Sequence, residues 1–280
     1  MKRSTLLALF LSLFLAACGD DDSGSSPVRD TDSSSSEAEG SGPESSEDRY
    51  SSSEEDLGPV VEADSCGISG KDECEFGTLT DDRDGLEYKT VKIGKQTWMA
   101  ENLNYEIVDP KAGLPPTPCF DNKKDSCSKY GRYYTWAQAV DSAAMWSSSG
   151  KGCGSNVCRM KTPVRGICPK GWHLPSKAEW VYLLDAIGWE SSFEKLASKS
   201  GWFGYKSKGR DLFGFTALPG HRKENYGNWG RTGTESYFWS STQFDEAYAF
   251  IMYLNELETD AYVDMDFKRY SMNVRCIQDE

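Results

Sequence analysis

Residues 168–180 read CPKGWHLPSKAEW, and the fold of the chain can be worked outward from this stretch. Ser176 is followed three positions later by Glu179, which makes a capping box: the two side chains satisfy free N–H groups at a helix start. Gly188 then ends the helix, because glycine readily adopts the left-handed conformation that helix ends require. The spacing predicts an amphipathic helix with a buried stripe of Trp180, Leu183, Leu184 and Ile187.

The elements predicted on either side of this helix make an α+β domain. Residues 88–93 alternate in polarity and are joined to residues 96–99 by a Gly-Lys turn, which predicts a β-hairpin. A second helix is expected over residues 135–146, and a repeat of the capping pattern at Ser191 and Glu194 predicts a short third helix. Strands follow over residues 237–240, 247–254, 261–267 and 271–277. Because helices come first and a mainly antiparallel sheet follows, we expect an α+β fold with two to three helices.

The N-terminus has the features of a bacterial export signal. Lys2 and Arg3 give it a positive start, an apolar run covers residues 6–15, and small residues precede Cys18. We interpret residues 1–17 as a lipoprotein signal peptide and Cys18 as the lipidated first residue of the mature chain. The thioether-linked diacylglycerol and palmitate-type chains would hold the protein on a membrane, at about 0.8 kcal/mol per buried CH₂. The alternative is an ordinary cleaved signal that contains a cysteine.

An acidic, serine-rich tether is expected over residues 18–64. Positions 19–64 hold thirteen Ser, fifteen Asp or Glu and two Arg, so their net charge of −13 equals that of the whole chain. Such a segment buries too little apolar surface to fold, which predicts a disordered spacer. We expect an outer-membrane lipoprotein of the cell envelope, with the run of three aspartates after Cys18 read either as a surface-export signal or as the start of the tether. The remaining domain has no basic stripe, so nucleic-acid binding is not expected.

Nine cysteines less Cys18 leave eight, an even number in an exported chain. We expect four disulfides, although spacing does not fix their connectivity: three local bridges and one long-range bridge, Cys66–Cys74, Cys119–Cys127, Cys153–Cys158 and Cys168–Cys276. Residues 65–78 are taken as a small Cys-bounded loop and residues 79–280 as the folded domain. A zinc site is the competing interpretation, but the chain has no CxxC pair and only two histidines.

Seven ordered motifs in the domain point to a known family. They are DGLEYKTVKIG (84–94), QTWMAENLNY (96–105), GRYYTW (131–136), CPKGWHLP (168–175), GFTALPG (214–220), FWSST (238–242) and VRC (274–276). Together they resemble the Fibrobacter succinogenes major paralogous domain over residues 79–278. That resemblance implies an exported or surface protein of unassigned biochemical role. The layout is also similar to C-type-lectin-like domains and to the related formylglycine-generating-enzyme fold, which implies a fold and not a function.

No constellation typical of catalysis is recognisable, so we expect a non-enzyme without a cofactor. His173 has no evident nucleophile or orienting carboxylate nearby, which favours a structural role. His221 is interpreted either as a ligand contact or as an ordinary polar residue of a loop. Asp260, Asp264 and Asp266 keep calcium as an alternative, but the last two alternate with apolar residues, which is typical of the polar face of a strand.

The segment 201–235 is Gly-rich and aromatic with few element signals, and such long irregular segments are usually functional. Aromatic faces cover the C–H faces of sugars, while Asn and Arg donate to hydroxyls, so the candidate ligand-binding residues are Arg222, Asn225, Tyr226, Asn228, Trp229 and Arg231. The competing interpretation is that Tyr226 and Trp229 only pin the loop to the domain. We expect a non-catalytic envelope module that binds polysaccharide or protein. The alternatives are a structural assembly lipoprotein and an enzyme of the formylglycine-generating type, which would need free, copper-competent thiols.

Overall fold

The computed structural model describes residues 55–67, 74–107, 117–204, 208–224, 227–230 and 233–280. The chain divides into two units after Ser51, and every described residue belongs to the second unit. The expected signal peptide, Cys18 and most of the expected tether therefore lie outside the described residues. Within the described ranges, no helix combines the length and the apolar character needed to cross a membrane.

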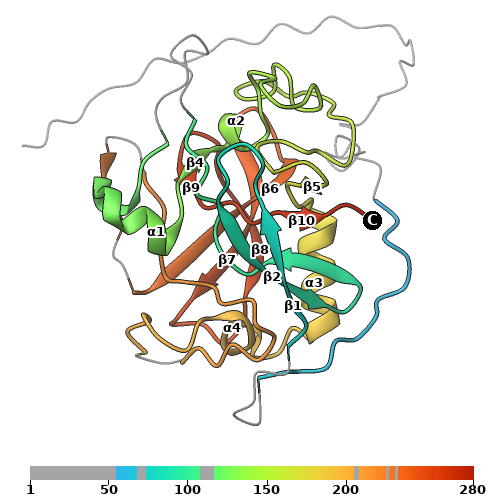
Figure 1. Cartoon of the computed structure of the whole chain (residues 1–280), viewed down its shortest axis with the longest axis vertical. Helices are drawn as coiled ribbons and strands as arrows, with labels where there is room; N and C mark the ends of the chain where they lie inside the picture. Colours follow the sequence, from blue (N-terminus) through green and yellow to red (C-terminus); the bar gives the residue numbers. More distant parts are fainter. Residues whose placement is uncertain (1–54, 68–73, 108–116, 205–207, 225–226, 231–232) are drawn as a thin grey trace, which may run out of the picture. The chain divides into compact units, whose positions relative to one another are not determined.

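The fold contains a five-stranded antiparallel sheet, and one helix packs on it (Figure 1). The strand order is β1 (Phe76–Thr80), β2 (Glu87–Ile93), β3 (Gln96–Met99), β10 (Ile277–Gln278) and β5 (Trp172–His173). The predicted hairpin is β2–β3, turned by Gly94 at φ 60°. Helix α3 (Lys177–Ile187) begins with the predicted capping box and ends at Gly188. The helix packs on the sheet through Trp180, whose ring stacks on Trp98 at 4.5 Å between centroids.

A three-stranded antiparallel sheet lies between two hydrophobic cores. Its strands are β6 (Glu235–Gln243), β7 (Tyr248–Asn255) and β8 (Tyr262–Phe267). Successive residues of a strand point to opposite faces, so Trp239 enters one core while Phe238 enters the other, which α3 covers. A two-stranded sheet of β4 (Tyr134–Thr135) and β9 (Ser271–Met272) completes the sheets. The predicted α+β class with mainly antiparallel sheets is confirmed.

The helix expected over residues 135–146 is wrong in extent. Only α2 (Trp136–Ala139) forms, and Asp141 then adopts φ 58°. The carboxylate of Asp141 accepts hydrogen bonds from the backbone N–H groups of Met145, Trp146 and Ser147 at 2.7–2.8 Å. Aspartate side chains compete in this way with the helical backbone pattern, and here the local turn replaces the helix.

Three other expected boundaries also need correction. The third helix, α4 (Ser192–Leu196), lacks the capping bond expected at Ser191, which takes φ 57° and donates its N–H to Asp260. The single strand expected over residues 271–277 divides into β9 and β10, which belong to different sheets. Strand β1 begins at Phe76, so the sheet starts inside the segment assigned to the Cys-bounded loop.

The last part of the expected tether packs along the domain as an extended strap, residues 57–67. The N–H of Val61 donates to the hydroxyl of Tyr182 at 2.8 Å, and the N–H of Ala63 donates to the carbonyl of Ala186 at 2.9 Å. Lys95 also binds the carbonyl of Leu57. The expected disorder up to residue 64 is therefore wrong for the strap, because its backbone groups are satisfied by α3 and the β2–β3 turn.

Four disulfides, with the pairing expected from the sequence, close the loops of the domain: Cys66–Cys74, Cys119–Cys127, Cys153–Cys158 and Cys168–Cys276. The last spans 108 residues and ties the start of the 168–180 stretch to the segment leading into β10. The neighbouring Arg275 is fully buried and donates to Asn102 Oδ1 at 2.8 Å and to the Thr216 carbonyl at 2.8 Å. These bonds join three motifs that lie far apart in the sequence.

Candidate functional site

The loop that carries most of the predicted ligand residues is fixed by a buried polar cluster at its base. His221 Nδ1 lies 2.8 Å from the N–H of Arg222 and 3.1 Å from its carbonyl oxygen, and Nε2 lies 2.5 Å from Glu235 Oε2. Glu235 also accepts the hydroxyls of Tyr237 at 3.0 Å and Tyr253 at 2.8 Å. Burial favours the neutral acid, but these hydrogen bonds outweigh it and lower the pKa of Glu235 to about 2. The carboxylate is thus a fixed anchor for both histidine and tyrosines.

Arg222 faces the interior of this region. Its guanidinium lies 2.9 Å from Glu224 and 3.3 Å from Asp266, and above the ring of Tyr237 at 4.7 Å. An arginine with two carboxylates and an aromatic ring as neighbours holds the loop against β8. These contacts hold the Arg222 side chain in place, and its role as a ligand contact stays a prediction.

Trp229 packs against two aromatic rings of the domain. Its ring meets Phe120 at 5.0 Å and Tyr133 at 4.7 Å in edge-to-face geometry. Lys223 pairs with Ser271 through two backbone hydrogen bonds of 2.9 Å and places its Nζ 5.5 Å from the centre of the Trp229 ring. Trp229 remains partly exposed, so it is both a brace and a part of the surface.

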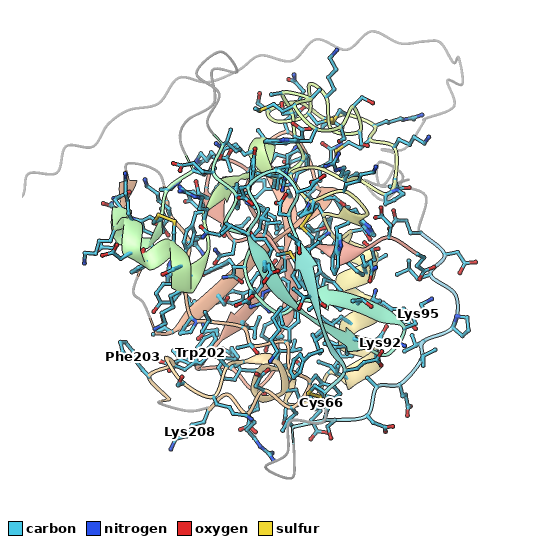
Figure 2. All side chains as sticks on the ribbon, viewed as in Figure 1. Cys66, Lys92, Lys95, Trp202, Phe203 and Lys208 are labelled. Atoms are coloured by element: carbon cyan, nitrogen blue, oxygen red, sulfur yellow. A yellow bond between two sulfur atoms is a disulfide. The ribbon has the colours of Figure 1, made fainter. Side chains whose placement is uncertain are left out.

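The structure describes one of the four remaining ligand residues that the sequence predicts in the loop. Asn228 is exposed, and its carbonyl accepts the N–H of Glu224 at 2.9 Å. Asn225, Tyr226 and Arg231 lie outside the described residues. Earlier in the segment, Phe203 is half exposed next to Trp202, at the periphery of the fold (Figure 2).

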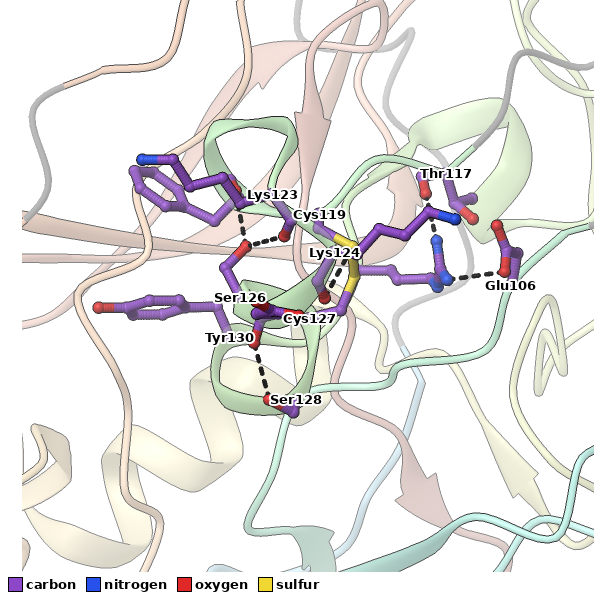
Figure 3. The surroundings of a disulfide bond; sticks show 12 residues. Glu106, Thr117, Cys119, Lys123, Lys124, Ser126, Cys127, Ser128 and Tyr130 are labelled. Atoms are coloured by element: carbon purple, nitrogen blue, oxygen red, sulfur yellow. Dashed lines mark hydrogen bonds and ion pairs between the residues drawn. A yellow bond between two sulfur atoms is a disulfide. The ribbon is translucent and has the colours of Figure 1, made fainter.

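A disulfide-closed knob, residues 117–133, is the feature that sequence reasoning missed (Figure 3). It comprises η3 (Phe120–Asn122), η4 (Lys124–Ser126) and α1 (Cys127–Tyr130). The Ser126 hydroxyl lies within hydrogen-bonding distance of the carbonyls of Phe120 at 2.6 Å and Lys123 at 2.7 Å, so a side chain fixes the turn inside the bridge. The available signal was a pair of close cysteines that bracket Phe120 and the adjacent lysines Lys123 and Lys124.

The knob and the loop form one continuous surface, because Phe120 of the knob touches Trp229 of the loop and Lys223 reaches Asn122 at 3.2 Å. On the knob, Phe120 and Tyr130 are 5.4 Å apart and partly exposed. We call this surface the aromatic–lysine face and define it as Phe120, Tyr130, Trp229, Lys129 and Lys223. The side chain of Lys124 extends to the other side of the disulfide, toward Glu106 (Figure 3).

His173 lies in a different place and is clamped between two carboxylates. Its Nε2 is 2.7 Å from Glu179 and its Nδ1 is 2.7 Å from Asp279. Burial alone would lower the pKa of His173, but hydrogen bonds and the charges of Glu179 and Asp279 outweigh it and raise the pKa above its usual value. The expectation that no carboxylate lies near was wrong. With both nitrogens occupied, the imidazole has no free lone pair to act as a base, which fits a structural role.

The aspartates considered for calcium are held apart by other partners. Asp260 accepts the N–H of Ser191 at 2.7 Å, Asp266 faces Arg222, and Asp264 is exposed on β8. Asp264 and Asp266 share one side of that strand, but the burial does not alternate as predicted, because Met265 between them is exposed and Asp266 is partly buried. In the described ranges, no three His, Cys, Asp or Glu residues gather as a set of metal ligands.

A shallow cavity of about 430 Å³ lies beside β4, lined in part by Thr135, Ser142, Glu246 and Lys268. The Nζ of Lys268 donates to Asp245 and lies 4.2 Å from the centre of the Trp136 ring. Burial lowers the pKa of Lys268 to about 8. The interactions of Lys268 with the backbone and with the ring show that it secures the β7–β8 region.

Comparisons with known proteins found one family. The model of the Fibrobacter succinogenes major domain matches residues 91–278. No curated protein and no solved structure matches the chain.

Proposed function

The chain belongs to the Fibrobacter succinogenes major domain family, and on that premise we propose that it is a lipid-anchored, non-catalytic binding module of the cell envelope. The family match covers residues 91–278, from β2 to the C-terminal strand. The proposal places the protein on the outer membrane through Cys18, with the domain held beyond the membrane by the acidic segment that precedes the strap.

We assign the domain a C-type-lectin-like fold. Two observations support this assignment: a long-range disulfide, Cys168–Cys276, links the residues before β5 and α3 to the C-terminal segment, and β10 pairs between β3 and β5. This arrangement closes the domain on its own ends. Irregular segments that follow such a framework, among them residues 227–230, can carry ligands without changing the core.

The aromatic–lysine face is the observation that carries the binding proposal. Two segments about 100 residues apart meet there, each with its own constraint: the Cys119–Cys127 bridge fixes the knob, and the His221–Glu235 pair fixes the loop. A surface that is rigid before binding loses little conformational entropy on binding. Partly exposed aromatic rings at its centre are typical anchors of such surfaces.

The chemistry of the cysteines favours binding over an enzyme of the formylglycine-generating type. That reaction would need free thiols, and the structure pairs Cys168 with Cys276 in a buried bridge. Titration of free thiols in the unreduced protein tests this part of the proposal: two reactive thiols per folded chain would return the enzyme to consideration.

The binding proposal is tested with the purified full chain and its Tyr130→Ala variant on a panel of insoluble and soluble polysaccharides. Loss of one aromatic contact of about 1 kcal/mol predicts roughly fivefold weaker retention. Tyr262→Ala, which removes an exposed tyrosine from β8, is the matched control and should bind as the unmodified chain does. Absence of retention on every polysaccharide, together with reproducible protein crosslinks in cells, would favour a structural assembly lipoprotein instead.

A further inference from the structure

Strand β8 (Tyr262–Phe267) has an outer edge that no other strand covers in the part of the chain that the structure describes. It lies at the end of the β6–β7–β8 sheet and pairs with β7 alone. We propose that Asp264 and Asp266 cap the outward N–H groups of β8 and thereby keep this edge from pairing with a second copy of the chain. The inference goes beyond the proposed function and does not depend on any ligand.

Hydrogen bonds at the end of the strand show which backbone groups face outward. The N–H of Lys268, just after β8, donates to the carbonyl of Ala247, just before β7, at 2.8 Å. In an antiparallel ladder, the backbone groups of alternate residues point toward the partner strand and those of the others point away. Even-numbered residues of β8 therefore face β7, and the backbone groups of Val263, Met265 and Phe267 face outward.

Two of these outward N–H groups are already bonded to aspartate side chains. The N–H of Met265 donates to Asp264 Oδ1 at 2.7 Å, and the N–H of Phe267 donates to Asp266 Oδ1 at 2.8 Å. A second strand on this side would need the same two donors. Each donor would have to leave a carboxylate, and hydrogen bonds to charged groups are stronger than those between neutral groups. Pairing would therefore exchange strong bonds for weaker ones.

Without the aspartates, the edge would suit pairing well. The strand is six residues long, and Val263, Met265 and Phe267 are apolar. Met265 is also 38% exposed. An exposed edge of this kind is a template for another chain, because its backbone groups lack partners. Pairing of β8 with the same strand of a second copy follows a two-fold axis and stops at a dimer.

The charge of the carboxylates acts in the same direction as the caps. Two copies of β8 that pair antiparallel about Met265 would place Asp264 of one copy opposite Asp266 of the other. Like charges directly opposite each other on neighbouring strands are destabilising. Asp266 also lies 3.3 Å from Arg222, whereas Asp264 is exposed and makes no ion pair within the described ranges, so position 264 is the better place for a test.

The test measures self-association of the Asp264→Thr variant by sedimentation velocity over a series of concentrations. Threonine favours strands and has no carboxylate to accept the N–H of Met265. The full chain carries Cys18→Ala throughout, so that a lipid anchor does not itself bring copies together. We expect the dimer dissociation constant of Asp264→Thr to be at least tenfold lower than that of the parent chain. Asp82→Thr removes an exposed aspartate outside β8 and should sediment as the parent does.

Two further variants identify the cap and the edge. Asp264→Asn removes the charge but keeps an oxygen that can accept the N–H of Met265, so it should sediment as the parent does. Association as strong as that of Asp264→Thr would overturn the capping role. Asp264→Thr/Met265→Pro deletes an N–H that β7 does not use, and it should restore the parent behaviour.

The outcomes against the proposal are equally definite. Dimers that persist in the proline variant would use another surface, and they would overturn the assignment to β8. An Asp264→Thr variant that stays monomeric at every concentration would overturn the proposal as a whole. Urea unfolding of each variant with its disulfides intact accompanies the sedimentation, because association of an unfolded chain would not be relieved by proline at position 265.

Discussion

Removal of the imidazole that bridges Glu179 and Asp279 should destabilise the domain, and the loss should depend on pH in a defined direction. The side chains of His173 and Glu179 are 8% and 11% exposed, so His173→Gln weakens a buried pair, and breaking such a pair costs about 3 kcal/mol. The side chain of Asp279 is 45% exposed, so its ion pair with His173 contributes at most about 1 kcal/mol to the stability of the fold. Asp279→Asn should therefore cost far less than His173→Gln.

The sign of the pH dependence follows from the raised pKa of His173 in the folded state. The charged imidazole donates to both carboxylates, so its stabilisation is fully present below the unfolded pKa of about 6.5 and is lost as pH rises through the folded pKa. Urea unfolding with the disulfides intact, at pH 6 and at successively higher pH, should show the gap between the unmodified chain and His173→Gln closing with pH. A difference in unfolding free energy that stays constant or widens toward alkaline pH would refute the stabilising interaction of His173 with the two carboxylates.

Three further outcomes are expected. A Cβ at Gly230 would lie 1.5 Å from the ring of His221, so Gly230→Ala should cost about 1–3 kcal/mol in urea unfolding, whereas Gly154→Ala, with its nearest contact at 3.2 Å, should cost less. Cys168→Ser opens a bridge that spans 108 residues, which chain-entropy models value at about 4–5 kcal/mol, and thermal unfolding should show a correspondingly lower midpoint. Cys18→Ala should release the protein from the membrane fraction into the soluble one, and a variant that stays with the membrane would contradict lipidation.

Local signals predicted the fold where neighbouring residues decide the structure. The capping box at Ser176 and the turn at Gly94 depend on residues within four positions, and both appear as expected. The helix expected at residues 135–146 failed because its apolar spacing was correct but the carboxylate of Asp141 captured the N–H groups that the helix needed. Periodicity reports which side chains are apolar, not whether a polar side chain competes for the backbone.

The site was harder to predict because its contacts join distant positions. The Phe120–Trp229 contact spans more than 100 residues, and no local pattern in either segment indicates it. The Asp279 arm of the His173 clamp is equally remote in sequence, while Glu179 was recognised only as a helix cap although its second oxygen binds the imidazole. Sequence reasoning proposed the loop, and the contact between Phe120 and Trp229 in the structure adds the knob to the proposed surface.

Several side chains of the motifs that identify the family stabilise the fold, so the proposed binding would depend on other residues. Arg275 of the VRC motif binds Asn102 and the carbonyl of Thr216, which belong to two other motifs. His173 and Glu179 fix the start of α3. Side chains so engaged are not available to a ligand. The knob and residues 221–224 and 227–230 of the loop lie between these motifs and present the partly exposed Phe120, Tyr130 and Trp229. A shared framework with a variable surface at this position would let related domains bind different ligands, so exchange of the knob and loop together should transfer binding between them.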